Sequence, residues 1–501
     1  GICCAYGTGA YTVSSDGTVL ASGGEFTTTE ATDVCLGSGF GCTDPTACNY
    51  DPTATADDDS CTVNDQCGVC NGDDSCCENS YCSVSTTKDG PWSSGSTWET
   101  GAVPPPSMDV FINHHVTVDS DLTVNGLISI SDNKSITISP GNSLSHSGEL
   151  DNNGNISGSF VLVGTSRALN IGDVEDLIVS VTGTVSASDD LSISRLLRVD
   201  DEATLDVSGY EAVLLADANV TALVHDNGGT TTGDFIVQQH IKRAIETTNG
   251  TVYQPYANVF YGPPVSNPTI SQMQQNTDIV ITGNANSFCF NENTSQWTPP
   301  SSFSEVMPAG KGWYQYAFIE PSGDTWEFEG ELNTGSIVTP ISNTVGEGWN
   351  IVSNPYPSPI NLQDLWNSGQ NPGVFYRYNG DSYNAFIASV GLSSDPQGLT
   401  EYVPSMQGFW VNAEADSYDY TSVNFTSACR VSDPTEAIDD FTKINNDSLP
   451  LFYLGMHQGG NLISNLFYFH PDATNGYDHI YDAKYLDGFT GWQFGSIKDA
   501  E

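Results

Sequence analysis

Short alternating runs of apolar and polar residues dominate this chain, and most runs end at Asn, Gly, Asp or Ser. Such alternation places every second side chain on one face, which predicts β-strands. An apolar period of 3.6 residues is almost absent, apart from a weak hint at residues 361–367. We therefore expect an all-β protein made of β-modules in tandem.

The first 88 residues divide into two predicted parts. Residues 10–13, 18–21 and 25–28 alternate, and Ser15-Asp16-Gly17 between the first two runs is typical of a hairpin turn. Residues 1–40 are predicted to be the C-terminal part of a β-sandwich. Residues 41–88 contain no core-forming run and are predicted to form a disulfide-rich linker.

Residues 89–245 carry many short apolar runs separated by turn residues at irregular intervals, such as Val116-Thr-Val118 and Ile136-Thr-Ile138. A chain that winds as short strands buries alternate residues in a stacked core, so we predict a right-handed parallel β-helix. The opening, with Trp92, Trp98 and Asp109-Val-Phe-Ile112, resembles the entry to solenoids of secreted bacterial surface proteins.

Residues 246–345 and 346–432 contain an internal duplication, which predicts a pair of related β-sandwich modules packed on each other. In both copies Pro and Gly stand four residues apart ahead of an aromatic residue, at Pro308/Gly312 and Pro404/Gly408. Residues 445–501 resemble the start of a jelly-roll module that precedes type IX sorting domains. The chain is therefore expected to lack sequence at both ends.

Two further motifs carry a family resemblance. The segment from Gly348-Trp-Asn to Ser358-Pro-Ile360 resembles a signature of type IX secretion substrates. The segments at residues 41–61 and 65–74 resemble Cys-rich motifs of large secreted proteins of the Bacteroidota. The resemblance implies a large modular cell-surface protein exported by a type IX-like route.

Charge excludes several function classes. Lys plus Arg total 13 and Asp plus Glu total 62, so the net charge is −49. Phosphate contacts need basic residues, so we expect no nucleic-acid partner. No apolar stretch approaches the ~18–20 residues of a membrane helix, so no membrane insertion is expected. Strong negative charge keeps such a chain soluble and mutually repelling.

Cysteine usage predicts an oxidising, extracellular compartment. The dense N-terminal cysteines are predicted to form a disulfide region without assigned pairs: Cys3, Cys4, Cys35, Cys42, Cys48, Cys61, Cys67, Cys70, Cys76, Cys77 and Cys82. Zinc is the alternative, because Cys67 and Cys70 form a C-x-x-C, although no second one follows at zinc-ribbon spacing. Cys289 and Cys429 form a possible pair that would join the two copies.

A calcium site is the one cofactor that the sequence suggests, and otherwise we expect none. Several acidic residues cluster where basic residues are absent, and carboxylate oxygens are the ligands that Ca²⁺ prefers. The candidate ligands are Asp57, Asp58, Asp59, Asp65, Asp73 and Asp74. The alternative is a solvated acidic linker.

Catalytic signatures are absent from the sequence, which contains no G-x-S-x-G, G-x-x-x-x-G-K or H-E-x-x-H. His114 and His115, if they lie on a strand, face opposite sides and cannot easily chelate one metal. Six tryptophans of the duplicated region either stack on sugars or form the module cores: Trp297, Trp313, Trp326, Trp349, Trp366 and Trp410. Asp447-Ser-Leu449 resembles a bacterial O-glycosylation motif, which would place a glycan on Ser448.

We therefore expect a non-catalytic extracellular protein that acts as a stalk, an adhesin or a surface-filament subunit. Its expected partners are copies of itself or other cell-surface components, and possible ligands are glycans. A secreted polysaccharide-active β-helix enzyme or a carbohydrate-binding protein is the alternative. A subunit whose open β-domain accepts a strand from a neighbour is a further one.

Overall fold

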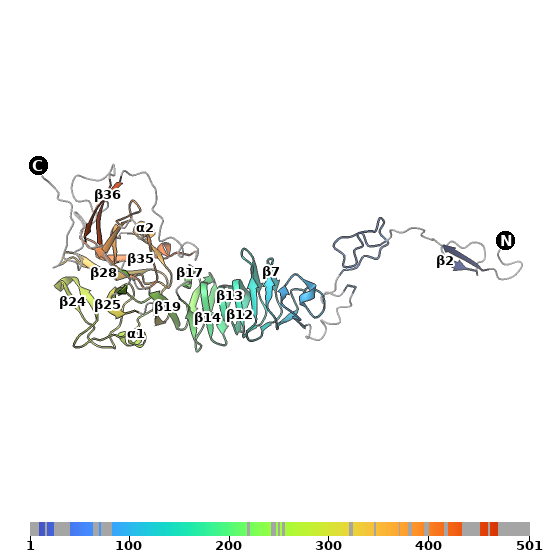
Figure 1. The fold of residues 1–501 in the computed structure, drawn as a ribbon. Helices are drawn as coiled ribbons and strands as arrows, with labels where there is room; N and C mark the ends of the chain where they lie inside the picture. Colours follow the sequence, from blue (N-terminus) through green and yellow to red (C-terminus); the bar gives the residue numbers. More distant parts are fainter. Residues whose placement is uncertain are drawn as a thin grey trace. The chain divides into compact units, whose positions relative to one another are not determined.

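The computed structural model describes two compact units, Gly1–Cys82 and Ser83–Glu501. The described residues are 10–15, 18–24, 41–63, 70–71, 83–217, 221–241, 247–248, 251–252, 256–319, 324–344, 347–369, 371–378, 383–394, 400–414, 419–432, 451–458 and 461–468. Within them the protein is nearly all β, as predicted (Figure 1). Helices are limited to α1 (Ile270–Asn276), α2 (Leu362–Asn367) and three short 3₁₀ turns in this part of the chain.

The described residues of the first unit form one antiparallel hairpin and a disulfide-linked segment. Strands β1 (Tyr11–Ser15) and β2 (Thr18–Gly23) pair with a shift in register between Val13 and Ser14. They match two of the three predicted strands, and the third, at residues 25–28, lies outside the described residues. The segment from residue 41 to residue 63 is built from turns and isolated bridges.

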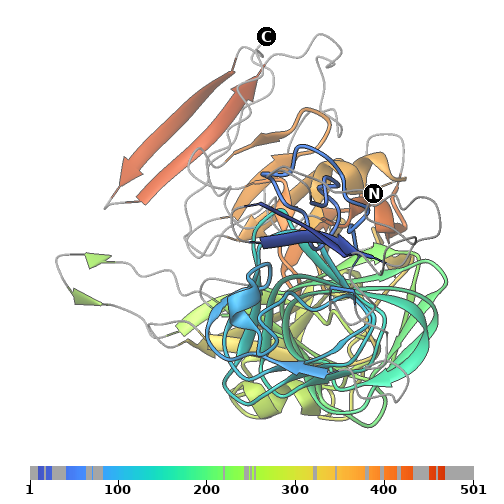
Figure 2. The same ribbon diagram turned by 90° about the vertical axis from the view of Figure 1, so that its right-hand side faces the viewer.

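A parallel β-solenoid opens the second unit and confirms the predicted β-helix. Its strands form three faces, each of which stacks in parallel from one coil to the next. Face A contains β4 (Gly90–Pro91), β6 (Val116–Val118), β9 (Ser135–Ile138), the first parts of β12 (Asn155–Leu169), β13 (Gly172–Ala187) and β14 (Leu191–Asp200), then β16 (Ala212–Leu214) and β19 (Phe235–Ile241). Figure 2 views the solenoid nearly end-on, so that successive coils overlie one another.

The other two faces share the long strands β12 and β13. Face B contains β7 (Leu122–Val124), β10 (Ser143–His146), the middle of β12 and β13, the end of β14, and β17 (Leu223–Asn227). Face C contains β3 (Ser83–Ser85), β5 (Asp109–Ile112), β8 (Ile128–Ile130), β11 (Leu150–Asn152), the ends of β12 and β13, β15 (Ala203–Asp206) and β18 (Thr230–Thr232).

Apolar residues fill the solenoid and Asp residues hold its turns. On face B the fully buried Leu144, Phe160, Leu177 and Leu197 stack in register. Alternation therefore works as the sequence predicted, because inward positions form one continuous core. Asp side chains accept hydrogen bonds from amides of the next coil, as Asp121 does from Ser143 N at 2.8 Å. This role accounts for part of the acidic composition.

Tryptophans close the first coil. Trp92 and Trp98 are both buried and pack edge to face, with ring centroids 4.8 Å apart. The Trp98 indole N–H donates to Trp92 O at 2.9 Å. The aromatic pair seen in the sequence therefore covers the N-terminal end of the stacked core.

The duplicated region forms two sheets with the same strand order. The first sheet runs β22 (Tyr256–Tyr261), β25 (Trp313–Phe318), β23 (Ser287–Asn291) and β24 (Gln296–Thr298). The second runs β28 (Trp349–Ser353), β34 (Gly408–Asn412), β30 (Val374–Tyr378), β31 (Tyr383–Ile387) and β32 (Leu392–Ser393). Helix α1 follows the first strand of one copy, and α2 follows the first long strand of the other.

Reciprocal contacts join the two copies, as in a pair of subunits related by a two-fold axis. Lys311 of the first copy forms a bridge with Val352 of the second, and Gln407 of the second forms a bridge with Tyr261 of the first. The two bridges are equivalent in the repeat. Lys311 corresponds to Gln407, because each precedes the glycine of the Pro/Gly motif, and Tyr261 corresponds to Val352. The contact is therefore pseudo-symmetric and made largely by the backbone.

An aromatic layer lies between the sheets, and a second core lies behind the sheet of the second copy. Phe260 contacts Tyr314, Tyr378, Tyr383 and Trp410 in this layer. Behind the second sheet, Phe375 and Phe409 pack with α2 and with the paired strands β27 (Ile337–Pro340) and β35 (Ser422–Phe425).

The remaining paired strands are short or separate. They are β29 (Ile360–Asn361) with β33 (Tyr402–Val403), β20 (Thr247–Thr248) with β21 (Thr251–Val252), and β36 (Leu451–Gln458) with β37 (Asn461–Tyr468). The last hairpin falls in the predicted jelly-roll segment, and residues 469–501 lie outside the described part of the chain.

Candidate functional site

The solenoid and the duplicated modules share one hydrogen-bonded sheet. Strand β19 continues face A and pairs antiparallel with β26 (Asp324–Gly330), from Phe235 opposite Gly330 to Ile241 opposite Asp324. Backbone hydrogen bonds therefore run from the last coils directly into the module region. Trp326 and Phe328 on β26 are buried, and both rings contact Tyr261 of the first copy.

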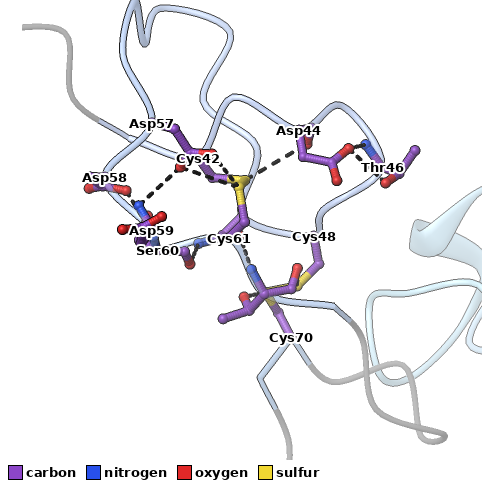
Figure 3. The surroundings of a disulfide bond; sticks show 12 residues. Cys42, Asp44, Thr46, Cys48, Asp57, Asp58, Asp59, Ser60, Cys61 and Cys70 are labelled. Atoms are coloured by element: carbon purple, nitrogen blue, oxygen red, sulfur yellow. Dashed lines mark hydrogen bonds between the residues drawn. A yellow bond between two sulfur atoms is a disulfide. The ribbon is translucent and has the colours of Figure 1, made fainter.

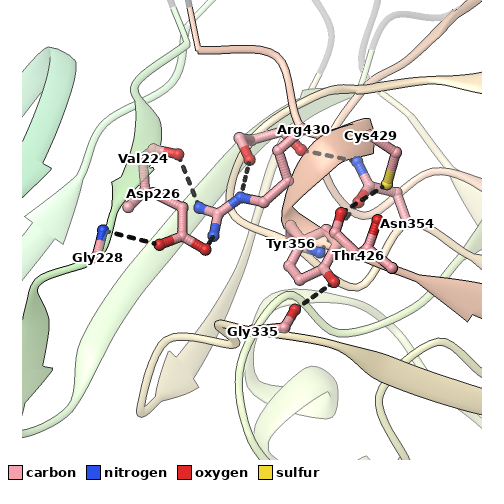
Figure 4. A network of polar contacts seen from close by, with 10 residues as sticks. Val224, Asp226, Gly228, Gly335, Asn354, Tyr356, Thr426, Cys429 and Arg430 are labelled. Atoms are coloured by element: carbon pink, nitrogen blue, oxygen red, sulfur yellow. Dashed lines mark hydrogen bonds and ion pairs between the residues drawn. The ribbon is translucent and has the colours of Figure 1, made fainter. Parts of the chain in front are cut away.

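A buried arginine forms a second connection at the end of face B (Figure 4). Arg430 Nη1 lies 3.0 Å from Asp226 Oδ2, and its Nη2 donates to Val224 O at 2.7 Å. Its Nε donates to Ser358 Oγ at 3.1 Å. Asp226 and Val224 belong to β17, whereas Ser358 lies in the proline-rich segment of the second copy. The planar guanidinium thus joins three chain segments at once.

The proline-rich segment itself packs on the last coil. Val224 N donates to Pro357 O at 3.0 Å, and the Arg430 guanidinium lies 4.9 Å from the centre of the Tyr356 ring. The Tyr356 hydroxyl donates to Gly335 O at 2.6 Å, and Asn354 Nδ2 donates to three carbonyl oxygens. The signature recognised in the sequence therefore contacts the end of the solenoid.

Electrostatics make this arginine dependent on its partner. Burial lowers the pKa of Arg430, and the negative charge of Asp226 counteracts that effect. Burial also raises the pKa of the Tyr356 hydroxyl above its usual value, so it stays a neutral donor. A buried guanidinium needs its carboxylate, because an unpaired buried charge is strongly destabilising.

A shallow acidic groove lies at the corner between faces C and A on the last coils. Its volume is about 600 Å³, and it is lined by the turn from Val207 to Ala212, by the turn from Thr232 to Asp234, and by Ile236, Glu329 and Glu331. Glu211, Asp234, Glu329 and Glu331 are all exposed, as is Tyr210. The described residues that line the groove include no Lys, Arg or His.

A carboxyl group with an altered pKa lies at a corner of the solenoid. Asp176 is buried and is paired with Arg195, whose Nε lies 3.0 Å from Glu175 Oε1. Burial raises the pKa of Asp176 to about 6, although the charge of Arg195 acts in the opposite direction. This carboxyl is therefore easier to protonate than an exposed aspartate.

Among the described cysteines of the Cys-rich segment, two disulfides form and confirm that part of the prediction (Figure 3). They join Cys42 to Cys61 and Cys48 to Cys70. Cys70 belongs to the C-x-x-C motif that made zinc binding the alternative to disulfides, and it is disulfide-bonded to Cys48. The other predicted cysteines lie outside the described residues: Cys3, Cys4, Cys35, Cys67, Cys76, Cys77 and Cys82.

The predicted calcium ligands are only partly described. Asp57 Oδ1 accepts from Asp59 N, and Asp58 Oδ1 accepts from Ser60 N, both at 3.0 Å. These contacts are turns in which a side chain caps the local backbone. Asp65, Asp73 and Asp74 lie outside the described residues. No group of three His, Cys, Asp or Glu in the described part of the chain is arranged to hold a metal ion.

Cys289 and Cys429 do not form the predicted disulfide, because both are free thiols. Cys289 lies half-buried on β23 of the first sheet. Cys429 is buried in the core behind the second sheet and donates to Thr426 O at 3.0 Å. Burial raises its pKa to about 11, so it remains a protonated, apolar packing group.

The other candidate side chains have mainly structural surroundings. Trp313, Trp326, Trp349 and Trp410 are buried, which confirms the core interpretation for these four, whereas Trp297 and Trp366 are half-buried. His114 and His115 lie in the turn between β5 and β6 rather than on a strand. Their Nδ1 atoms contact Thr86 and Ser135 respectively. Ser448 lies outside the described residues.

Several residues of the junction were missed from the sequence. Arg430 carried a usable signal, because only 13 Lys and Arg occur in the chain and this one stands among apolar and small residues. The groove carried none, since its three lining segments are far apart in sequence. None of the helices in the described residues is long and apolar enough to cross a membrane.

Comparison with known proteins gives one match. A family model described as a domain of unknown function (DUF8693) matches residues 161–374. This segment begins within β12, includes both strands of the β19–β26 pairing, and ends at the first residue of β30. No curated protein and no solved structure gives a significant match to the chain.

Proposed function

We propose that this chain is a non-catalytic structural or adhesive protein of an extracellular surface, exported by a type IX-like route. It acts as a stalk, an adhesin or a surface-filament subunit. The observation that carries the proposal is the antiparallel pairing of β19 with β26 over seven residues. This pairing continues the solenoid ladder into the module pair. Several hydrogen bonds of the ladder therefore carry a pulling force together, which a single-chain linker could not do.

The buried ion pair and the disulfides support the same role. Arg430 joins the far side of the junction to Asp226, so the modules are held at two faces of the last coils. Disulfides limit the extension of the Cys-rich segment and are typical of extracellular proteins. Calcium binding by the Asp-rich segment remains a prediction within this proposal.

Force spectroscopy tests the mechanical role. The full chain is stretched from its two ends, and the last coils are expected to unfold together with the first module in one event. The wild type is compared with Val237→Pro, a variant in which β19 loses one backbone hydrogen-bond donor. Two separate low-force events in the wild type would contradict the proposal, as would protein-dependent release of products from polysaccharides.

A polysaccharide-active enzyme is the second candidate, and the Asp176 cluster favours it. Burial raises the pKa of Asp176 to about 6, and the residue lies beside Glu175 and Arg195, a combination of perturbed carboxyl and charged neighbours that is common at catalytic sites. The test is incubation with neutral and acidic polysaccharides, with Asp176→Asn as the inactive variant. Turnover lost in that variant and retained in Asp132→Asn, at an exposed aspartate elsewhere on the solenoid, would establish the enzyme and replace the structural proposal.

A further inference from the structure

Face C ends in a strand that has one open edge among the described strands. Face A continues into β26, and face B is covered by Pro357 and Arg430. On face C the last strand is β18, which pairs with β15 and with no other described strand. A free edge offers unpaired backbone donors and acceptors to another extended chain.

The register identifies the free groups. Val207 N donates to Thr232 O, so the backbone groups of Thr230 and Thr232 are directed towards β15. In a parallel ladder alternate residues bond to opposite neighbours. The N–H and C=O of Thr231 are therefore directed away from β15, towards the open side of the strand.

The acidic groove begins at the next residue. Thr232 and Gly233 line it, together with the exposed carboxylates Glu211, Asp234, Glu329 and Glu331. These carboxylates are not arranged to hold one metal ion, since no described group of three His, Cys, Asp or Glu is. The groove is thus suited to a ligand with several positive charges spaced apart, and Tyr210 adds an exposed ring for cation–π contact.

We propose that β18 and the acidic groove together form a docking site for a basic polypeptide segment in extended conformation. The segment adds as a strand at Thr231, and its Lys or Arg side chains reach the groove carboxylates. Glu329 and Glu331 stand two positions apart in sequence, as do side chains on one face of a strand. Backbone pairing supplies the binding mode, and charge complementarity selects the partner. The site does not depend on the mechanical role of the junction.

Binding to the full chain tests the proposal by fluorescence anisotropy of labelled peptides at low salt. The probe is a short peptide of alternating Lys and Thr. One control peptide replaces Lys by Glu, and a second keeps every charge but carries N-methyl groups that block strand pairing. The groove variant is Glu329→Gln with Glu331→Gln, and its matched control is Asp132→Asn with Glu149→Gln, two exposed acidic residues elsewhere on the solenoid.

The expected result is binding of the Lys peptide that weakens as salt is added. Affinity falls roughly tenfold in the groove variant and stays unchanged in the matched control. The N-methylated peptide binds at least tenfold more weakly than the unmodified one. The proposal would be overturned if the Lys peptide and the Glu peptide bound with equal affinity, or if affinity fell equally in both double variants. It would also be overturned if the chain bound an amino-sugar polymer but not the Lys peptide. Each of these failures leaves the force measurement on the junction unaffected.

Discussion

Gly262 of the first module faces Ser353 of the second so closely that a Cβ added to Gly262 would lie 2.0 Å from Ser353 Oγ. The two residues are equivalent in the repeat, and each donates its backbone N–H across the interface. Gly262 N donates to Met406 O at 2.9 Å, and Ser353 N donates to Gly310 O at 2.8 Å. The near-symmetric contact thus requires glycine on one side because the other side carries a side chain.

Gly262→Ala is therefore expected to destabilise the module pair. Ser353 is fully buried and Lys311 O lies 2.7 Å from the added atom, so neither group can move aside freely. We expect a loss of about 1–3 kcal/mol in the free energy of unfolding, measured by urea denaturation. Gly369→Ala is the matched control, because a Cβ there meets only Asn371 Nδ2 at 3.8 Å. Equal effects of the two substitutions would contradict the interface described here.

Removing Asp226 is expected to leave a buried, uncompensated charge. Asp226→Asn should cost about 3–5 kcal/mol, because Arg430 is buried and its acceptors Ser358 Oγ and Val224 O are neutral. The measurement is chemical denaturation monitored by tryptophan fluorescence. Arg198→Lys, at the more exposed Arg198–Asp200 pair, is the control and should change stability by less than about 1 kcal/mol. An equally small effect of Asp226→Asn would show that water reaches the guanidinium.

Acid is expected to destabilise the solenoid through His146. Burial lowers the pKa of His146 from 6.5 to about 4, although its ring nitrogens lie 3.1 and 3.0 Å from Val124 O and Glu149 O. Below pH 6.5 the unfolded chain takes up a proton that the folded chain refuses until about pH 4. Stability attributable to this residue therefore falls as pH drops through that window, by at most about 3 kcal/mol.

The pH dependence is measured as the urea midpoint between pH 7 and pH 4. His146→Gln should flatten the acid side of the curve, whereas His115→Gln, at an exposed histidine, should leave it unchanged. A curve with the same slope in wild type and His146→Gln would show that another group dominates acid unfolding.

Reduction is expected to loosen the Cys-rich segment. The bridges close loops with sequence separations of 19 and 22 residues, which corresponds to about 3 kcal/mol each in the chain-entropy model. Hydrogen exchange at residues 41–63 should therefore become fast in dithiothreitol while exchange in the solenoid stays slow. Unchanged protection after verified reduction would mean that the turns hold this segment without the disulfides.

Terbium luminescence checks the calcium prediction in the same segment. Tb³⁺ is expected to bind and to be displaced by Ca²⁺, with weaker binding after Asp57→Asn combined with Asp58→Asn. Asp132→Asn combined with Asp151→Asn is the charge-matched control on the solenoid. The absence of saturable binding would return the aspartates to the role of local turn caps.

Alternation and turn residues were enough to predict the β-solenoid and the repeated modules. The inward columns through Phe160 and Leu177 follow directly from a two-residue period, and α2 falls where the weak helical hint lay. Helix α1 was missed because only Ile270 and Met273 among its residues are apolar, although Thr269 and Gln272 form a capping box at its start.

Long-range contacts were beyond the sequence. Arg430 and Asp226 are separated by 204 residues, and no local pattern links them. The pairing of Cys289 with Cys429 failed for a related reason, since Cys429 lies in the core behind the second sheet whereas Cys289 is half-buried on β23 of the first sheet. The acidic groove likewise depends on the turn that happens to follow β15 lying beside β26.

The reciprocal contact between the modules has an evolutionary consequence. A single module that could make this contact would pair with a copy of itself, so duplication of its coding segment would capture a dimer within one polypeptide. The two halves could then diverge, because only one of them had to keep its original surroundings. The second half carries Ser353 where the first has Gly262, and the two halves meet the solenoid differently, the second through Pro357 and the first through β26. Residues on either side of this contact should consequently vary together among relatives.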